Sequence, residues 1–133
     1  MALKIKIQED LRVALKEKKE ITLATLRMLL SAINNRETEK RTRLYRDFGG
    51  QAKISESELI KKLEESSKLT DEETIEVISS EIKKRKEAIA GFEQGGRQEL
   101  AEKEQKESEI LAKYLPEQLS EEEIKKQLEE LNK

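Results

Sequence analysis

The chain has 133 residues, enough for one domain, or for one domain and a fragment of another. Charged residues make up 42% and aromatic residues 3%, and cysteine and histidine are absent, which excludes disulfides and zinc–thiolate sites. One proline and five glycines leave little turn chemistry for a β protein, so apolar stripes on highly charged helices are the expected source of the core.

The net charge of −2 hides an uneven distribution along the chain. Residues 1–54 hold 13 Lys/Arg against 7 Asp/Glu, whereas residues 55–133 hold 14 against 22. A basic first half can meet an acidic partner or the protein's own second half, and the second explanation is the more usual. No stretch nears the roughly 18 consecutive apolar residues of a membrane span, and MALKIKIQEDL carries charges where a signal peptide is apolar. We expect a soluble cytoplasmic protein.

Two helices are predicted at the start of the chain. The first covers about residues 2–18, where apolar residues recur at three- and four-residue steps: Leu3, Ile7, Leu11, Ala14 and Leu15. The second runs from about Glu20 to about Lys40, and its middle, TLRMLLSAI, is apolar on nearly every side. Such a helix is surrounded by others, so it is the expected centre of the core.

A break is predicted over residues 42–54, TRLYRDFGGQAKI, where Gly49-Gly50 interrupts any helix. We expect a loop there, anchored by Tyr45 and Phe48. The sequence S-E-S-E from Ser55 then offers a capping box for a short third helix.

A long helical hairpin is predicted next. A second capping box at Thr70 opens a helix of about 24 residues that ends at Gly95-Gly96. Ile75, Ile78, Ile82, Ile89 and Phe92 line one face of it, with Arg85 at the position between Ile82 and Ile89. A fifth helix follows over 97–115, and its middle, EKEQKESE, is polar all round, so we expect the hairpin to stand partly in solvent.

The only proline marks a further boundary. Pro116 stops the fifth helix, and S-E-E-E from Ser120 starts a sixth whose single apolar stripe is Ile124, Leu128 and Leu131. Alone in water so short a helix is marginal, so it must dock on something. We therefore expect an N-terminal helical domain over 1–115, with 42–67 as an apparent insertion, and a linker plus the start of a second small helical domain over 116–133.

Three groups of residues are candidates for contacts with RNA or a protein. Basic residues gather around RETEKRTRLYR, where arginine and lysine can bind phosphate and Tyr45 can stack a base: Arg36, Lys40, Arg41, Arg43 and Arg46. Glu37, Glu39 and Asp47 dilute this basic patch, and a solvated helix end is the more usual explanation. A basic run, Lys83, Lys84, Arg85 and Lys86, points in all directions around its helix and makes no single patch. Arg27 heads a polar stripe with Ser31, Asn34 and Thr38, which can grip a partner or form the wet side of the helix.

The residues that usually support independent catalysis are missing. The chain has no cysteine nucleophile, no histidine base, no HExxH spacing and no glycine-rich phosphate loop. Its glutamates lie along solvated helix faces, whereas paired acid–base work needs two carboxyls in unlike, partly buried environments. We expect no catalytic residues, no cofactor and no metal.

Three segments in order, TLRMLLSAINNRETEKR, LTDEETIEVISSEIKKRKEAIAGFE and GRQELAEKEQKESEILAKYLPEQLSEEEI, resemble the YqeY-like family over residues 1–41 and 68–131. That family is similar to the tail region of the B subunit of the glutamine-dependent tRNA amidotransferase. The resemblance implies an all-helical protein in two parts and an association with tRNA. It also implies a link to carbon–nitrogen ligases that use glutamine as amido-N-donor, without carrying over any catalytic residue. Two hypotheses follow: an accessory tRNA-associated module, or a protein–protein adaptor with no nucleic-acid role.

Overall fold

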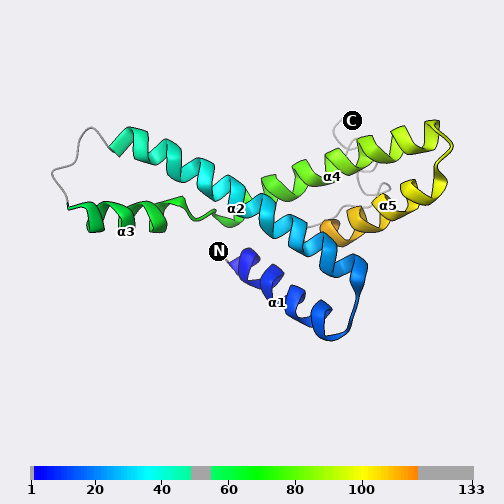
Figure 1. The fold of residues 1–133 in the computed structure, drawn as a ribbon, viewed down its shortest axis with the longest axis horizontal. Helices are drawn as coiled ribbons and strands as arrows, with labels where there is room; N and C mark the ends of the chain where they lie inside the picture. Colours follow the sequence, from blue (N-terminus) through cyan, green and yellow to red (C-terminus); the bar gives the residue numbers. More distant parts are fainter. Residues whose placement is uncertain (1, 49–54, 117–133) are drawn as a thin grey trace, which may run out of the picture.

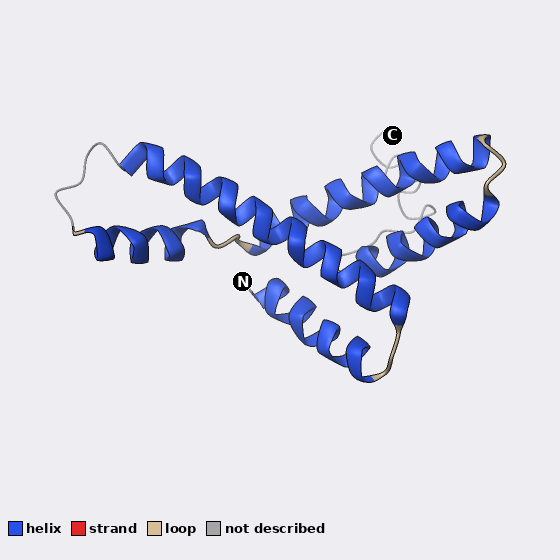
Figure 2. Cartoon of the chain, in the orientation of Figure 1, coloured by secondary structure: helices blue, strands red, loops and turns tan. Residues whose placement is uncertain are grey.

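A computed structural model describes residues 2–48 and 55–116, and within these ranges the chain forms five helices and no strand (Figure 2). The helices are α1 (Ala2–Lys16), α2 (Glu20–Phe48), α3 (Glu56–Ser67), α4 (Asp71–Gln94) and α5 (Gln98–Ala112). The predicted all-α class is confirmed. The predicted domain boundary at Pro116 stays a prediction, because the sixth helix and the rest of 117–133 lie outside the described residues.

α2 is the central element of the bundle (Figure 1). It packs against α1, α3, α4 and α5, as its nearly all-round apolar middle predicts. α1 runs back along its first half, α3 lies beside its second half, and α4 and α5 form the predicted hairpin (Figure 1). The core joins all these elements except α3 through nine buried apolar side chains: Ile7, Leu26, Leu29, Ile33, Leu69, Val77, Ile78, Ile82 and Leu111.

The helix ends follow local capping chemistry. Thr70 and Glu73 form the full predicted capping box at the start of α4, and the Ser55 hydroxyl accepts a hydrogen bond from the Glu58 N–H at 3.3 Å. α1 ends two residues earlier than predicted because Lys18 adopts a left-handed φ of 56°. The Lys19 N–H then donates to the Ala14 carbonyl at 3.0 Å, the pattern of a Schellman motif.

The predicted loop from residue 42 is wrong over its first part. α2 continues to Phe48 as one helix of 29 residues, roughly 43 Å long. The stretch after Lys40 holds no glycine or proline before Gly49, so nothing in its backbone chemistry stops the helix. Tyr45 does not anchor a loop, since it sits on the helix with 56% of its surface exposed. Residues 49–54 of the predicted loop lie outside the described residues.

On α1 and α5 the sequence pattern predicted a different set of buried residues from the one that the structure shows. Leu15, predicted in the apolar stripe of the first helix, is 53% exposed because it lies one position beyond the buried Ala14 and so points about 100° away from it around α1. The middle of α5 is not wholly solvated, because Glu107 and Ser108 are buried against the rest of the hairpin. A polar stretch therefore forms part of the inner face of α5, and the next section gives the reason.

Candidate nucleic-acid interface

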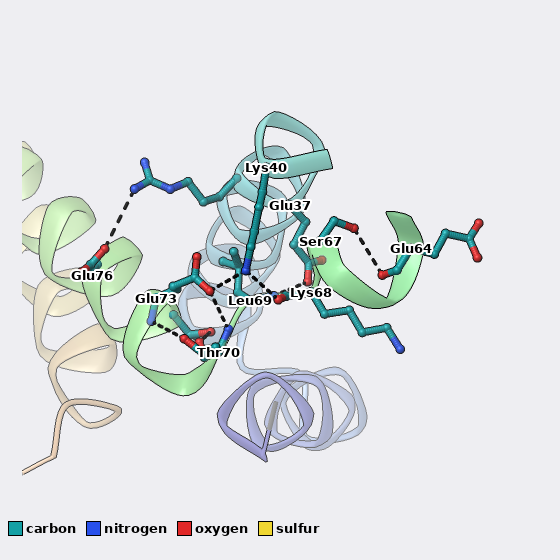
Figure 3. A network of polar contacts seen from close by, with 11 residues as sticks. Glu37, Lys40, Glu64, Ser67, Lys68, Leu69, Thr70, Glu73 and Glu76 are labelled. Atoms are coloured by element: carbon teal, nitrogen blue, oxygen red, sulfur yellow. Dashed lines mark hydrogen bonds and ion pairs between the residues drawn. The ribbon is translucent and has the colours of Figure 1, made fainter. Parts of the chain in front are cut away.

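Two of the predicted contact residues, Lys40 and Arg41, hold the connection between α3 and α4, and Figure 3 shows Lys40 there. The Lys40 ammonium lies 2.7 Å from Glu73 Oε1 and donates to the Lys68 carbonyl at 3.3 Å. Arg41 Nε donates to the Ser67 hydroxyl at 3.3 Å. The ammonium of Lys40, together with backbone and side-chain bonds at the helix cap, holds the pKa of Glu73 below its ordinary value. Lys40 and Arg41 are therefore engaged within the fold.

Glu37 makes a second set of hydrogen bonds at the same connection. It is only 8% exposed, and its two carboxylate oxygens accept from the Lys4 ammonium at 2.6 Å and from the Leu69 N–H at 3.1 Å. One side chain of α2 thereby ties α1 to the segment that leads into α4. Sequence reasoning treated Glu37 as a residue that dilutes a basic patch. Its burial could have been predicted from its position four residues after Ile33, on the core-facing side of α2.

Arg85 is buried inside the helical hairpin, with 5% of its surface exposed. Its Nη1 donates to Glu81 Oε2 at 3.1 Å, and its Nε lies 3.5 Å from Glu107 Oε2 and 4.0 Å from Glu104 Oε2. Burial, followed by the neighbouring charge of Glu107, raises the pKa of the Glu104 carboxyl. The predicted position of Arg85 on the apolar stripe is confirmed by its burial. It is a structural cation of the α4–α5 hairpin and takes no part in an exposed surface.

A groove with a volume of about 440 Å³ lies between α2 and α4 and brings two predicted contact residues together. Arg36 comes from α2 and Lys84 from α4, and their side chains are 51% and 70% exposed. Arg36 Nη2 lies 4.0 Å from Glu76 Oε2, while Lys84 Nζ lies 3.5 Å from Glu81 Oε1. Exposed ion pairs at these distances contribute little and are readily exchanged for other partners. Both cations are therefore available to a ligand with stronger charge.

Arg36 also begins a row that continues along α2 beyond the groove. Arg43 and Arg46 follow it by seven and ten residues, so all three lie on one face of the helix. We call Arg36, Arg43 and Arg46 the arginine row. Arg43 and Arg46 are exposed, and neither forms an ion pair with another residue in the part of the chain that the structure describes.

The continuous helix divides the predicted basic patch into separate sides. Arg41 turns toward the α3–α4 connection, whereas the arginine row follows the side of α2 that borders the groove with α4. Lys40 comes four residues after Arg36 and three before Arg43, so it lies beside the row, but its ammonium is bonded to Glu73 and to the Lys68 carbonyl. Tyr45 stands nine residues after Arg36, half a turn away from it around the helix. The predicted pairing of an aromatic ring with these arginines on one surface is therefore not what the helix presents.

The remaining predicted contact residues lie on other surfaces. Arg27 is exposed and stands nine residues before Arg36, on the opposite side of α2. Lys83 and Lys86 are exposed on α4 and lie at helical positions well away from Lys84. These three cations belong neither to the groove nor to the arginine row.

Other kinds of site find no support in residues 2–48 and 55–116. Within these ranges no group of three or more Asp, Glu, Cys or His residues is arranged to hold a metal ion. Among the same residues, no helix combines the length and the apolar character needed to cross a membrane. The closest set of carboxylates, Glu81, Glu104 and Glu107, is occupied by the guanidinium of Arg85.

Comparison with known proteins gives a family. A family model described as Yqey-like protein matches residues 4–132, which is nearly the whole chain and includes the segment 42–67. A search of curated proteins finds no match.

Proposed function

The chain belongs to the YqeY-like family, and we propose that it is an accessory module that binds tRNA or tRNA-bound machinery in the cytoplasm. The family relationship to the tail region of the tRNA amidotransferase B subunit supports this assignment. In this proposal the carbon–nitrogen ligase reaction with glutamine as amido-N-donor takes place on other subunits. The protein contributes a binding surface and no catalytic residue.

The observation that carries the proposal is the arginine row. Three guanidinium groups lie on one face of a continuous helix, and two of them, Arg43 and Arg46, pair with no described acidic residue. Guanidinium groups match phosphate oxygens in bidentate geometry, and neutralising phosphates releases counterions, which drives nucleic-acid binding. Lys84 adds a fourth cation from α4 at the end of the row. The row is thus a surface whose charge and geometry suit phosphate oxygens.

The absence of a catalytic role is supported by the chemistry of the chain itself. The sequence has no histidine or cysteine to act as a base or a nucleophile. The partly buried carboxylates that approach one another are neutralised by Arg85, so they are committed to the hairpin. Acid–base catalysis needs carboxyls that are free to exchange protons with a substrate.

The test is tRNA affinity measured across a salt series for the wild-type protein and for Arg43→Glu/Arg46→Glu. Arg41 is left unchanged because its bond to Ser67 is structural. We expect the double variant to weaken binding about tenfold or more and to flatten the slope of log K against log salt by roughly 1.4 to 1.8, since each of the two phosphate contacts contributes about 0.7 to 0.9.

Arg27→Glu is the control for position, because it makes one Arg→Glu reversal in the same helix on the side opposite Arg36, a charge change of −2 against −4 for the double variant. It should leave affinity and salt slope close to those of the wild type. Equal losses from both variants would show that only overall charge matters. No tRNA binding near physiological salt would overturn the proposal and leave the protein–protein adaptor as the better hypothesis.

A further inference from the structure

The shape of the arginine row contains information about which form of RNA it fits. Arg36, Arg43 and Arg46 span ten residues of uninterrupted helix, roughly 15 Å along its axis. All three side chains are exposed, and the bond from Arg41 to Ser67 of α3 lies on another side of α2, so α3 does not cover the row. The row is therefore a rigid line of three cations on an exposed face, with the exposed carboxylate of Glu39 between Arg36 and Arg43.

Neither tyrosine of the chain lies beside Arg36 at the groove end of the row. Tyr45 lies half a turn away around α2. Tyr114 belongs to a different part of the fold, where its hydroxyl donates to Asp10 Oδ2 at 2.6 Å and its ring lies 6.0 Å from the Lys6 ammonium. Proteins that bind unpaired bases rely on aromatic platforms for stacking, and each stacked base contributes substantially to affinity.

The groove between α2 and α4 adds a cation and two carboxylates next to the arginine row. Lys84 stands on α4 across from Arg36, so cations from two helices meet at one end of the row. Glu39 and Glu76 also line this groove, and their negative charge disfavours a strand that threads between the helices. A ligand that lies across the rim can contact Lys84 and the arginine row without entering the groove, and the guanidinium groups on both sides of Glu39 outnumber its carboxylate.

We propose that the arginine row and Lys84 bind the phosphate backbone of double-stranded RNA and do not read unpaired bases. This inference rests on the proposed function and specifies the part of the RNA that is bound. A duplex carries phosphate charge at high density along a rigid axis, which suits a rigid line of guanidinium groups. Double-stranded RNA is recognised through its shape and backbone, whereas sequence-specific recognition uses splayed single-stranded bases.

The experiment compares three probes at one ionic strength: tRNA, a blunt RNA hairpin with a stem of about 16 base pairs, and a single-stranded oligouridine with the same number of phosphates. We expect the hairpin to bind at least tenfold more tightly than oligouridine. Arg43→Glu/Arg46→Glu should reduce hairpin binding about tenfold or more, while Arg27→Glu leaves it unchanged. Equal or tighter binding of oligouridine would overturn the inference.

Tyr45→Ala provides the independent check on stacking. Because Tyr45 is exposed and off the row, we expect its replacement to change the affinity for each probe less than twofold. A loss of roughly tenfold would show that the ring stacks on a base and would contradict the inference. Failure of all three probes to bind would overturn the proposed function itself. Binding of tRNA without a preference for the hairpin would overturn only the assignment to duplex RNA.

Discussion

Replacing Arg85 by methionine isolates the contribution of the buried charge cluster to stability. Methionine keeps an unbranched stem in the space that the guanidinium now fills, beside Met28, and removes only the cation. Three carboxylates then lose their shared partner: Glu81, Glu104 and Glu107, whose side chains are 14%, 26% and 10% exposed. We expect the variant to fold with a lower free energy of unfolding.

The size of the loss follows from the distances and the burial. At 3.5 and 4.0 Å, each ion pair with Arg85 is worth about 4 kcal/mol before desolvation, if the effective dielectric constant is about 20. Removing one partner of a buried pair costs about 3 to 5 kcal/mol in measured cases. Because Glu104 is 26% exposed, water can relieve part of the loss, so we expect about 3 kcal/mol at pH 7. For a chain of this size that lowers Tm by about 10 °C.

Urea unfolding at pH 7 and at pH 4.5 is the assay. Without Arg85 three carboxylates lie close together with no cation between them, so the variant loses stability as they ionise with rising pH and recovers part of it at low pH, where carboxyls are protonated. Lys84→Met is the control, since that side chain is 70% exposed and its replacement should cost less than about 0.5 kcal/mol. A loss below about 1 kcal/mol at pH 7, or an equal loss at both pH values, would refute the electrostatic explanation.

The same cluster makes a prediction for the wild-type protein. Burial and Glu107 raise the pKa of Glu104 in the folded state. A carboxyl whose pKa is raised in the folded state stabilises the fold while it is protonated. This stability is lost as the pH rises from the ordinary carboxyl pKa to the folded-state pKa. The unfolding free energy of Glu104→Gln should therefore fall less than that of the wild type between pH 4.5 and pH 7. An equal fall in both proteins would assign the pH dependence to other groups.

Two further contacts can be tested with matched controls. Tyr114→Phe removes the hydroxyl that donates to Asp10 at 2.6 Å and should lower the unfolding free energy by about 1 to 2 kcal/mol, while Tyr45→Phe, at an exposed position, should have no measurable effect. Glu37→Gln weakens the bonds that Glu37 makes to Lys4 of α1 and to Leu69 of the α3–α4 connection. It should lower the unfolding free energy by about 2 kcal/mol and speed amide hydrogen exchange across that connection. Glu39→Gln, at an exposed position of the same helix, should do neither. Unchanged exchange in the first variant would show that the buried carboxylate is not what holds the connection.

Local patterns predicted the fold class well because their causes are local. The 3-4 spacing of isoleucines and the capping box at Thr70 predicted α4 with its observed length of 24 residues. The family model over residues 4–132 agrees with the resemblance seen in three sequence segments. The end of α2 was mispredicted because two aromatic residues before Gly49 were taken as loop anchors, although the chain there contains no residue that stops a helix.

The candidate site could be predicted only in part. Ten basic residues were candidates, and their charge is a property of the sequence alone. Whether each cation is free depends on partners far along the chain. Lys40 meets Glu73 thirty-three residues later, and Arg85 is enclosed by glutamates from both helices of the hairpin. No helical period reveals such pairings, because they arise when separate helices pack.

The sequence by itself therefore determined that the chain is helical, where most of its helices begin, and which family it belongs to. Helix periodicity, capping and family motifs act over a few residues or survive as short patterns. Only the tertiary structure decided which cations are paired within the fold and which remain exposed on the arginine row. That decision depends on which faces of α2 are covered by α1, α3 and the hairpin, and long-range packing sets those faces.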